Sequence, residues 1–282
     1  MIRSVSLIAF FSFLITPLLF SQTHPYRWLE SYHYDQAIVS RIHPPEGFSR
    51  IEQSENSFGN WLRNLPLKPG KPSVKLYNGQ LKGNQSAHFA VIDIDTGNRD
   101  LQQCADAVMR LKAEYHYSCG EYPFIHFNFT SGDRAEYEKW RQGYRPRING
   151  NKVSWTKSAQ ADQSYASFRK YMNTVFTYAG TYSLSREMES VSDPNNMQSG
   201  DVFIFGGFPG HAVIVVDIAK NQKTGETAFL LAQSYMPAQE MHILNNPNNS
   251  GMSPWYIARK GYLRTPEWGF DEGSLKRFSK DE

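Results

Sequence analysis

Two short apolar runs separated by a glycine-rich stretch stand out in the hydrophobic pattern of the C-terminal half. Val202–Phe205 and Ala212–Val216 are apolar at every position, and each run has the length of a strand. Gly200-Asp201 reads as a turn before the first run, and residues 206–210 (Gly-Gly-Phe-Pro-Gly) form a turn too short for a helix. His211 therefore begins a strand that we expect to be buried on both faces, with the glycine-rich turn leaving one side of the ring open.

A third apolar run, residues 228–235, predicts a further buried strand with Gln233 near its end. Residues 100–115 instead repeat apolar side chains at helical spacing, and Asp100 is a plausible N-cap. Cys104 then lies in or near the first helical turn, where the helix dipole and unpaired amides favour a thiolate. We expect a lowered thiol pKa there.

The remaining pattern predicts an α+β chain. We expect short or regular helices at residues 57–63, 133–142 and 162–179, strands at 74–77, 88–94 and 122–129, and a sheet-closing segment at 255–257. The chain from Gly269 onward is polar, and we expect residues 269–282 to form a loose tail.

The N-terminus indicates export. Met1-Ile2-Arg3 is a basic start, residues 4–20 are apolar and uncharged, and a small polar residue follows. This is the pattern of a secretory signal peptide over residues 1–22, which places the mature protein in the periplasm or outside the cell. No later segment is long and apolar enough to span a membrane. We expect residues 23–268 to form one α+β domain.

The two cysteines of an exported chain suggest a disulfide. Cys104 and Cys119 stand 15 residues apart along one predicted helix, which is roughly 22 Å, whereas a disulfide needs Cα atoms within about 7 Å. We therefore expect free thiols.

A thiol at a helix start and a histidine at a strand start suit nucleophilic catalysis. Cys104 attacks, His211 takes its proton, and Gln233 on the neighbouring strand orients the imidazole. Each residue also has a plain structural interpretation: Cys104 as core packing, His211 as a loop histidine, and Gln233 as a solvated strand end.

The order of these residues resembles the papain-like cysteine enzymes of bacterial cell walls, the NlpC-type endopeptidases and CHAP amidases. Gln103-Cys104 is similar to the Gln-Cys pair of CHAP domains, and residues 200–202 and 210–215 are similar to their Gly-Asp and His strands. The Asp-Cys-Ser-Gly pattern of NlpC is absent. The resemblance implies a papain-like core at about residues 85–260, an antiparallel sheet packed on the cysteine-bearing helix, with an N-terminal elaboration.

The whole chain also resembles an uncharacterised family of secreted bacterial proteins, domain of unknown function 4846. Residues 102–107, 127–132 and 231–239 carry that likeness. It implies no known activity.

These features favour a secreted cysteine hydrolase, an amidase or peptidase acting on a peptide or cell-wall peptide. We expect Gln103, Trp155 and Tyr235 to contact substrate, and no cofactor or metal, because no HExxH or CxxC spacing occurs. The net charge of +3 is too balanced to indicate a nucleic-acid partner.

Two alternatives stay open. A binding module on the same fold would use exposed aromatics around Trp140, Tyr144, Trp155 and Trp255 to stack on sugars or peptides. An acyl or peptidyl transferase would use the same triad. The oligomeric state is not indicated by the sequence.

Overall fold

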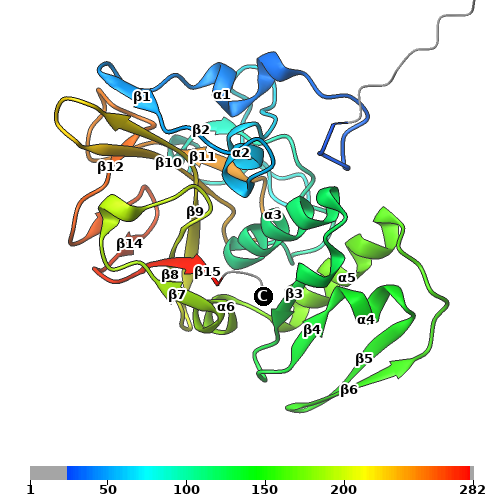
Figure 1. Cartoon of the computed structure of the whole chain (residues 1–282). Helices are drawn as coiled ribbons and strands as arrows, with labels where there is room; N and C mark the ends of the chain where they lie inside the picture. The colour runs from blue at the N-terminus through cyan, green and yellow to red at the C-terminus, as the bar shows by residue number, and fades with distance from the viewer. Residues whose placement is uncertain (1–23, 280–282) are drawn as a thin grey trace, which may run out of the picture.

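A computed structural model describes residues 24–279, and the signal peptide predicted at residues 1–22 lies outside this range. Figure 1 shows a large twisted sheet with helices along one side and a second group of helices and hairpins beside it. The α-helices are α1 (Ile38–Arg41), α2 (Phe58–Arg63), α3 (Cys104–Cys119), α4 (Tyr137–Arg141), α5 (Tyr165–Tyr178) and α6 (Thr181–Glu187). No described helix is long and apolar enough to cross a bilayer.

The main sheet is antiparallel throughout, as predicted. Its path runs β2 (His88–Val91), β11 (His242–Leu244), β10 (Thr227–Gln233), β9 (His211–Asn221), β8 (Val202–Phe205), β15 (Leu275–Phe278) and β7 (Met188–Ser190). Two short strands lie off this path: β1 (Phe48–Arg50) pairs with β9, and β12 (Tyr256–Ile257) pairs with β10. Residues 255–257 thus extend the sheet, as predicted.

Strands β9 and β10 form the centre of the core. The first nine residues of β9 and all of β10 are buried. Since successive side chains of a strand point to opposite faces, Ala212, Ile214 and Val216 join the larger apolar cluster with α3, whereas Val213 and Val215 join a second cluster on the other face. The expectation that this strand is buried on both faces is confirmed.

Helix α3 packs against β9 and begins at Cys104. The predicted start at Asp100 is wrong by about one turn. The Asp100 carboxylate accepts the Ala238 N–H at 2.7 Å and the Gln103 side-chain amide at 3.0 Å, so it is engaged outside the helix. Gln103 is the N-cap residue, and its own N–H donates to the Asp106 carboxylate at 3.0 Å. Cys104 therefore lies in the first turn, as predicted.

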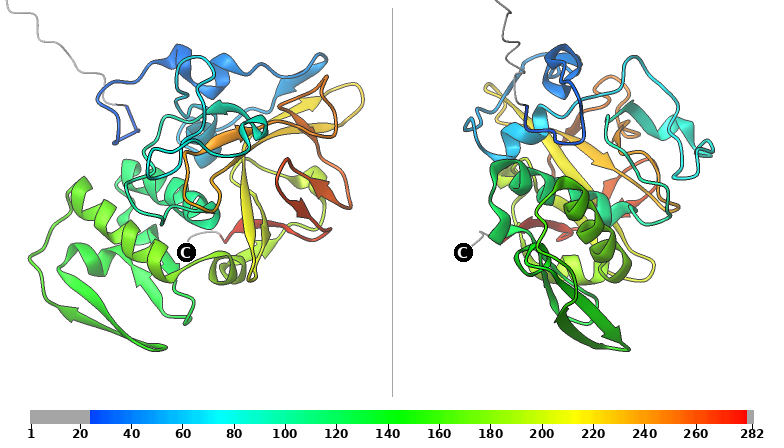
Figure 2. Two further views of the ribbon diagram at one scale, coloured as in Figure 1. Left: turned by 180° about the vertical axis from the view of Figure 1, so that it is seen from behind. Right: turned by 90° about the vertical axis from the view of Figure 1, so that its right-hand side faces the viewer.

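The second group of elements lies beside α3 (Figures 1 and 2). It contains α4, α5 and α6 with two hairpins, β3 (His126–Asn128) with β4 (Arg134–Glu136) and β5 (Tyr144–Asn149) with β6 (Lys152–Lys157). The helix predicted at 162–179 is confirmed as α5, capped by Ser164. The helix predicted at 133–142 is half strand, because residues 134–136 pair with β3. The strand predicted at 122–129 begins as a 3-10 turn, Tyr122–Phe124.

Of two predictions for the N-terminal part, one is confirmed and the other is wrong. Helix α2 forms as predicted, with the Ser57 hydroxyl accepting the Asn60 N–H at 3.1 Å. The strand predicted at 74–77 is wrong, because this segment makes only isolated bridges, Lys75 to Leu81 and Leu76 to Gln239. The backbone hydrogen bonds of residues 74–77 go to a loop and a turn, and they do not form the regular ladder of a strand.

The C-terminal segment is not loose over its described part. Residues Gly269–Phe270 form β14, which pairs with β13 (Leu263–Arg264), and β15 lies between β8 and β7. Arg277 of β15 also donates to both carboxylate oxygens of the buried Asp201, at 2.6 and 2.8 Å. This ion pair is long-range in sequence and holds the segment in the sheet.

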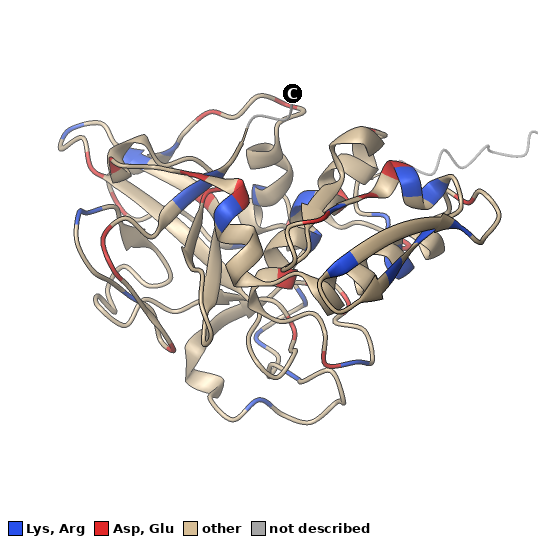
Figure 3. Ribbon diagram, turned by 90° about the horizontal axis from the view of Figure 1, so that it is seen from below, with Lys and Arg blue, Asp and Glu red and all other residues tan. Residues whose placement is uncertain are grey.

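Charged residues of both signs are intermixed along the elements (Figure 3). One buried cluster joins the N-terminal elements to the sheet. Asp217 of β9 accepts hydrogen bonds from Arg50 at 2.6 Å and from Arg63 at 2.7 and 3.0 Å. Because Asp217 is wholly buried, these two guanidinium groups compensate its charge and tie β1 and α2 to β9.

Candidate active site

The start of α3 and the start of β9 meet at Cys104 and His211. The Cys104 thiol lies against the backbone N–H of Ala212, the residue after His211. Cys104 is 8% exposed and His211 1% exposed. The two cysteines are unbonded to each other, as predicted, with Cys104 buried and Cys119 exposed at the far end of the helix.

Burial, and then the nearby Asp106 carboxylate, raise the pKa of the Cys104 thiol to about 11. The N–H groups of Ala212, Ala105 and Cys104 itself act in the opposite direction and lower it. The predicted lowering of this pKa is therefore wrong. The helix start does supply its donors, but desolvation of the anion outweighs them.

The His211 ring is held from its Nε2 side. Its Nε2 lies 3.0 Å from the Gln233 side-chain oxygen on the adjacent strand. An amide oxygen only accepts, so Nε2 carries the proton and Nδ1 keeps a lone pair. Burial lowers the pKa of His211 to about 4, and the hydrogen bond with Gln233 opposes this only partly. His211 is thus a neutral imidazole at pH 7 whose Nδ1 carries no proton.

The orientation of the Gln233 amide follows from its other contacts. Its nitrogen donates to Glu267 Oε2 at 2.7 Å and lies 3.3 Å from His242 Nε2. His242 Nδ1 donates to the Glu240 carbonyl at 2.9 Å, so its Nε2 accepts. Both amide protons are used, and the oxygen is left for His211. His242 thereby contacts the same amide.

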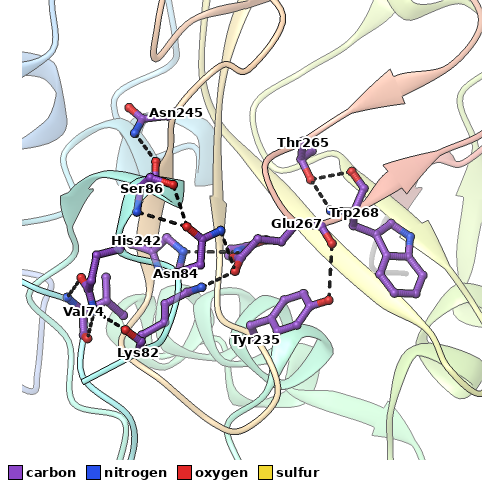
Figure 4. A network of polar contacts seen from close by, with 12 residues as sticks. Val74, Lys82, Asn84, Ser86, Tyr235, His242, Asn245, Thr265, Glu267 and Trp268 are labelled. Carbon is purple, nitrogen blue, oxygen red and sulfur yellow. Dashed lines mark hydrogen bonds and ion pairs between the residues drawn. The ribbon is translucent and has the colours of Figure 1, made fainter. Parts of the chain in front are cut away.

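Lys82 completes this set, since its ammonium group pairs with Glu267 Oε1. Figure 4 shows Lys82, Glu267 and His242 converging from three separate segments, with Tyr235 beside them. Five residues form what we call the Gln233 network: Lys82, His211, Gln233, His242 and Glu267. Sequence reasoning missed Lys82 and Glu267, because each lies in a loop with no periodic or motif signal.

Aromatic rings surround the imidazole. The ring centroid of Tyr235 lies 4.8 Å from that of His211, and those of Trp268 and Phe270 lie at 5.4 and 5.9 Å. Tyr235 is half-buried, and its hydroxyl approaches the Glu267 carbonyl at 3.4 Å. Tyr235 thus lies directly beside His211.

The other two predicted substrate contacts are placed differently. Gln103 precedes Cys104, but its side chain donates to Asp100 and not to the thiol or the imidazole. Trp155 lies on β6, in a hairpin that Figure 1 shows on the far side of α5 from β9 and β10. The structure does not bring Trp155 to the Cys104–His211 region.

The glycine-rich turn before His211 has a packing role. A Cβ on Gly210 would clash with Thr181 Oγ1, and one on Gly206 would clash with Ser185 Oγ. Helix α6 therefore covers this turn, and the expectation that the turn leaves one side of His211 open is not met. Phe208 at its tip is 82% exposed.

The thiol contacts the backbone of β9 at Ala212 and has no direct bond to the imidazole of His211. Within residues 24–279 no hydrogen bond joins Cys104 to His211. The arrangement provides a neutral thiol, a neutral base with a fixed tautomer, and three backbone N–H groups around the sulfur. Proton transfer from the thiol to Nδ1 would produce a nucleophile flanked by those donors.

The described residues form no metal site, and the features that could bind another ligand lie away from Cys104 or are buried. Among residues 24–279 no group of three His, Cys, Asp or Glu side chains is placed to hold a metal ion. A cavity of about 630 Å³ lies near Tyr26, Trp61 and Cys119, at the opposite end of α3 from Cys104. Trp140 and Trp255, which a stacking surface would need exposed, are 5% and 2% exposed.

Comparison with known proteins adds one finding. No curated protein and no solved structure matches this chain. Residues 38–277, most of the chain and nearly all of the described structure, match a family described as a domain of unknown function (4846). The match includes every residue of the Gln233 network and Cys104. The chain therefore belongs to the family of domain of unknown function 4846.

Proposed function

We propose that this protein is a cysteine hydrolase, an amidase or peptidase that cleaves an amide bond in a peptide or cell-wall peptide. The observation that carries the proposal is the hydrogen bond from His211 Nε2 to the Gln233 oxygen at 3.0 Å. It leaves Nδ1 as the unprotonated ring atom of His211, and the Cys104 thiol at the start of α3 lies against the N–H of the next residue, Ala212. The proposal also includes the resemblance to papain-like cell-wall enzymes and the predicted export of the protein.

The first step begins from neutral groups. Cys104 Sγ bonds to the carbonyl carbon while its proton passes to His211 Nδ1. The backbone N–H groups near the sulfur, those of Cys104, Ala105 and Ala212, stabilise the anion that develops. The C–N bond then breaks, and the leaving amine takes the proton from Nδ1. Water, deprotonated by the same imidazole, hydrolyses the thioester and regenerates the thiol.

The raised thiol pKa makes this a general-base mechanism without a preformed ion pair. At pH 7 the thiol and His211 are both neutral, since their pKa values are about 11 and about 4. Substrate must therefore supply part of the driving force by displacing water and bringing the carbonyl carbon to the sulfur.

The test uses purified mature protein with cell-wall peptide fragments and unrelated peptides as substrates. New amino groups are counted for the unaltered chain, Cys104→Ser and the matched control Cys119→Ser. We expect product from the unaltered chain and from Cys119→Ser, and a loss of at least 1,000-fold in Cys104→Ser. Equal product from Cys104→Ser would overturn the proposal. Binding of fragments that Cys104→Ser leaves unchanged, without product, would instead favour a binding module.

Burial of the thiol favours a second candidate, an acyl or peptidyl transferase. A thioester formed on a side chain only 8% exposed is shielded from water, which lengthens the time in which an amine can attack it. Product analysis with an added amine distinguishes the two: a transferase forms the new amide in preference to the free acid, and a hydrolase does not.

A further inference from the structure

We propose that Glu267 and Lys82 are positioning residues that fix the amide of Gln233 and, through it, the tautomer of His211. The catalytic part of this inference rests on the proposed function, whereas the tautomer does not. Neither residue belongs to the predicted triad. They come from loops 185 residues apart in the sequence and pair with each other beside Gln233.

The argument starts from the symmetry of a glutamine amide. Its oxygen and nitrogen have nearly the same shape, so packing alone does not decide which one faces His211. With oxygen toward the ring, Nε2 of His211 carries the proton and Nδ1 is the base. With nitrogen toward the ring, Nε2 must accept, the proton moves to Nδ1, and the thiol loses its acceptor.

Glu267 decides between the two orientations. Its Oε2 accepts the Gln233 amide nitrogen at 2.7 Å, the shortest contact that this amide makes. A carboxylate has no proton to donate, so only the nitrogen can face it. His242 favours the same orientation at the longer distance of 3.3 Å.

Lys82 holds the side chain of Glu267 in this place. The side chains of Lys82 and Glu267 are 6% and 12% exposed, so neither charge is well solvated. The ammonium group takes Oε1, as does the Asn84 amide at 3.4 Å, and this leaves Oε2 for Gln233. Figure 4 shows Lys82 and Asn84 both directed at the Glu267 carboxylate. Lys82 is therefore linked to the imidazole by three successive contacts, through Glu267 and Gln233.

The test reads the tautomer directly. The mature chain labelled with ¹⁵N-histidine is studied by long-range ¹H–¹⁵N NMR at pH 7, with His211 assigned from the loss of its signal in His211→Gln. Three variants are compared. Lys82→Met with Glu267→Met removes both charges together, so no buried charge is left unpaired. Glu267→Gln keeps one acceptor oxygen for Lys82 and presents an NH2 group to Gln233. Arg259→Met with Glu226→Met removes an exposed ion pair as the matched control.

In the unaltered chain we expect the Nε2–H tautomer of His211. In the Lys82/Glu267 double variant the ratio of Nε2–H to Nδ1–H should fall about tenfold, the effect of losing one hydrogen bond. Glu267→Gln should lower this ratio as well, because its single oxygen pairs with Lys82 and its amide nitrogen then faces Gln233. The control pair should keep the original tautomer. A double variant that folds and keeps the original ratio would overturn the inference, as would an Nδ1–H tautomer in the unaltered chain.

A measurement on the unaltered chain serves if the double variant does not fold. The Gln233 amide protons should exchange with solvent at least 100-fold more slowly than those of the exposed Gln222. Equal exchange rates would overturn the inference. Failure of the proposed function gives a different result. In that case Cys104→Ser leaves product formation unchanged, and the His211 tautomer still responds to the Lys82/Glu267 double variant.

Discussion

His211 and Gln233 face each other across neighbouring antiparallel strands, with 3.0 Å between the ring Nε2 and the amide oxygen. The contact is buried on both sides, with the two residues 1% and 2% exposed. It fixes which imidazole nitrogen is protonated. The chemistry available to Cys104 follows from that assignment, and so do the experiments below.

The first prediction concerns alkylation of Cys104 in a Cys119→Ser background. Because burial raises the pKa of this thiol to about 11, reaction with iodoacetamide should be slow at pH 7 and should rise steeply above pH 9. His211→Ala should leave the profile nearly unchanged, since the neutral imidazole contributes no charge. The rate is followed by mass spectrometry between pH 6 and 11. An apparent pKa below 8 would contradict the neutral resting state.

Asp106→Asn should shift that alkylation profile to lower pH. The Asp106 carboxylate raises the pKa of the Cys104 thiol by repulsion, so the neutral amide removes this effect. An asparagine oxygen can still accept the Gln103 N–H that Asp106 accepts at 3.0 Å, so α3 should keep its start. Circular dichroism checks the helix, and an unchanged or upward shift of the profile would refute the assignment.

Stability should fall in acid because His211 is buried as a neutral ring. Its pKa is about 4 in the folded chain and 6.5 when unperturbed. Between these values the unfolded chain binds the proton and the folded chain does not, so the free energy of unfolding falls as pH falls through this window. A gap of about 2.5 between the two pKa values corresponds to roughly 3 kcal/mol.

The measurement is the difference in unfolding free energy between the unaltered chain and His211→Gln, by urea denaturation from pH 4 to 7. Taking a difference cancels the opposite contribution of Glu187, whose pKa burial raises to about 7. A difference that does not vary with pH would mean that the ring is protonated in the folded state.

Truncation after Trp268 should unfold the domain or destabilise it by more than about 4 kcal/mol. It removes β15 from between β8 and β7 and leaves Asp201, 1% exposed, without Arg277. Truncation after Ser279 retains both interactions and is the control. Thermal unfolding compares the two chains, and equal midpoints would show that the C-terminal segment is dispensable.

The amino-acid pattern by itself determined the local elements with strong periodicity. Apolar runs predict the buried strands β8, β9 and β10, and helical spacing predicts α5 and the helix that carries Cys104. A segment that buries most of its side chains has little alternative to these regular structures. The contact between His211 and Gln233 followed from their places on two neighbouring strands. The free thiols followed from the length of one helix.

Tertiary structure decided what depends on distant segments. Residues 269–278 are polar enough to predict a tail, yet they join the sheet because Arg277 meets Asp201 and β8 offers an unpaired edge. The thiol pKa has the opposite direction to the local expectation, because burial by the sheet outweighs the helix start. Lys82 and Glu267 carry no signal in the sequence, since a hydrogen-bond network between loops is specified only when the fold brings them together.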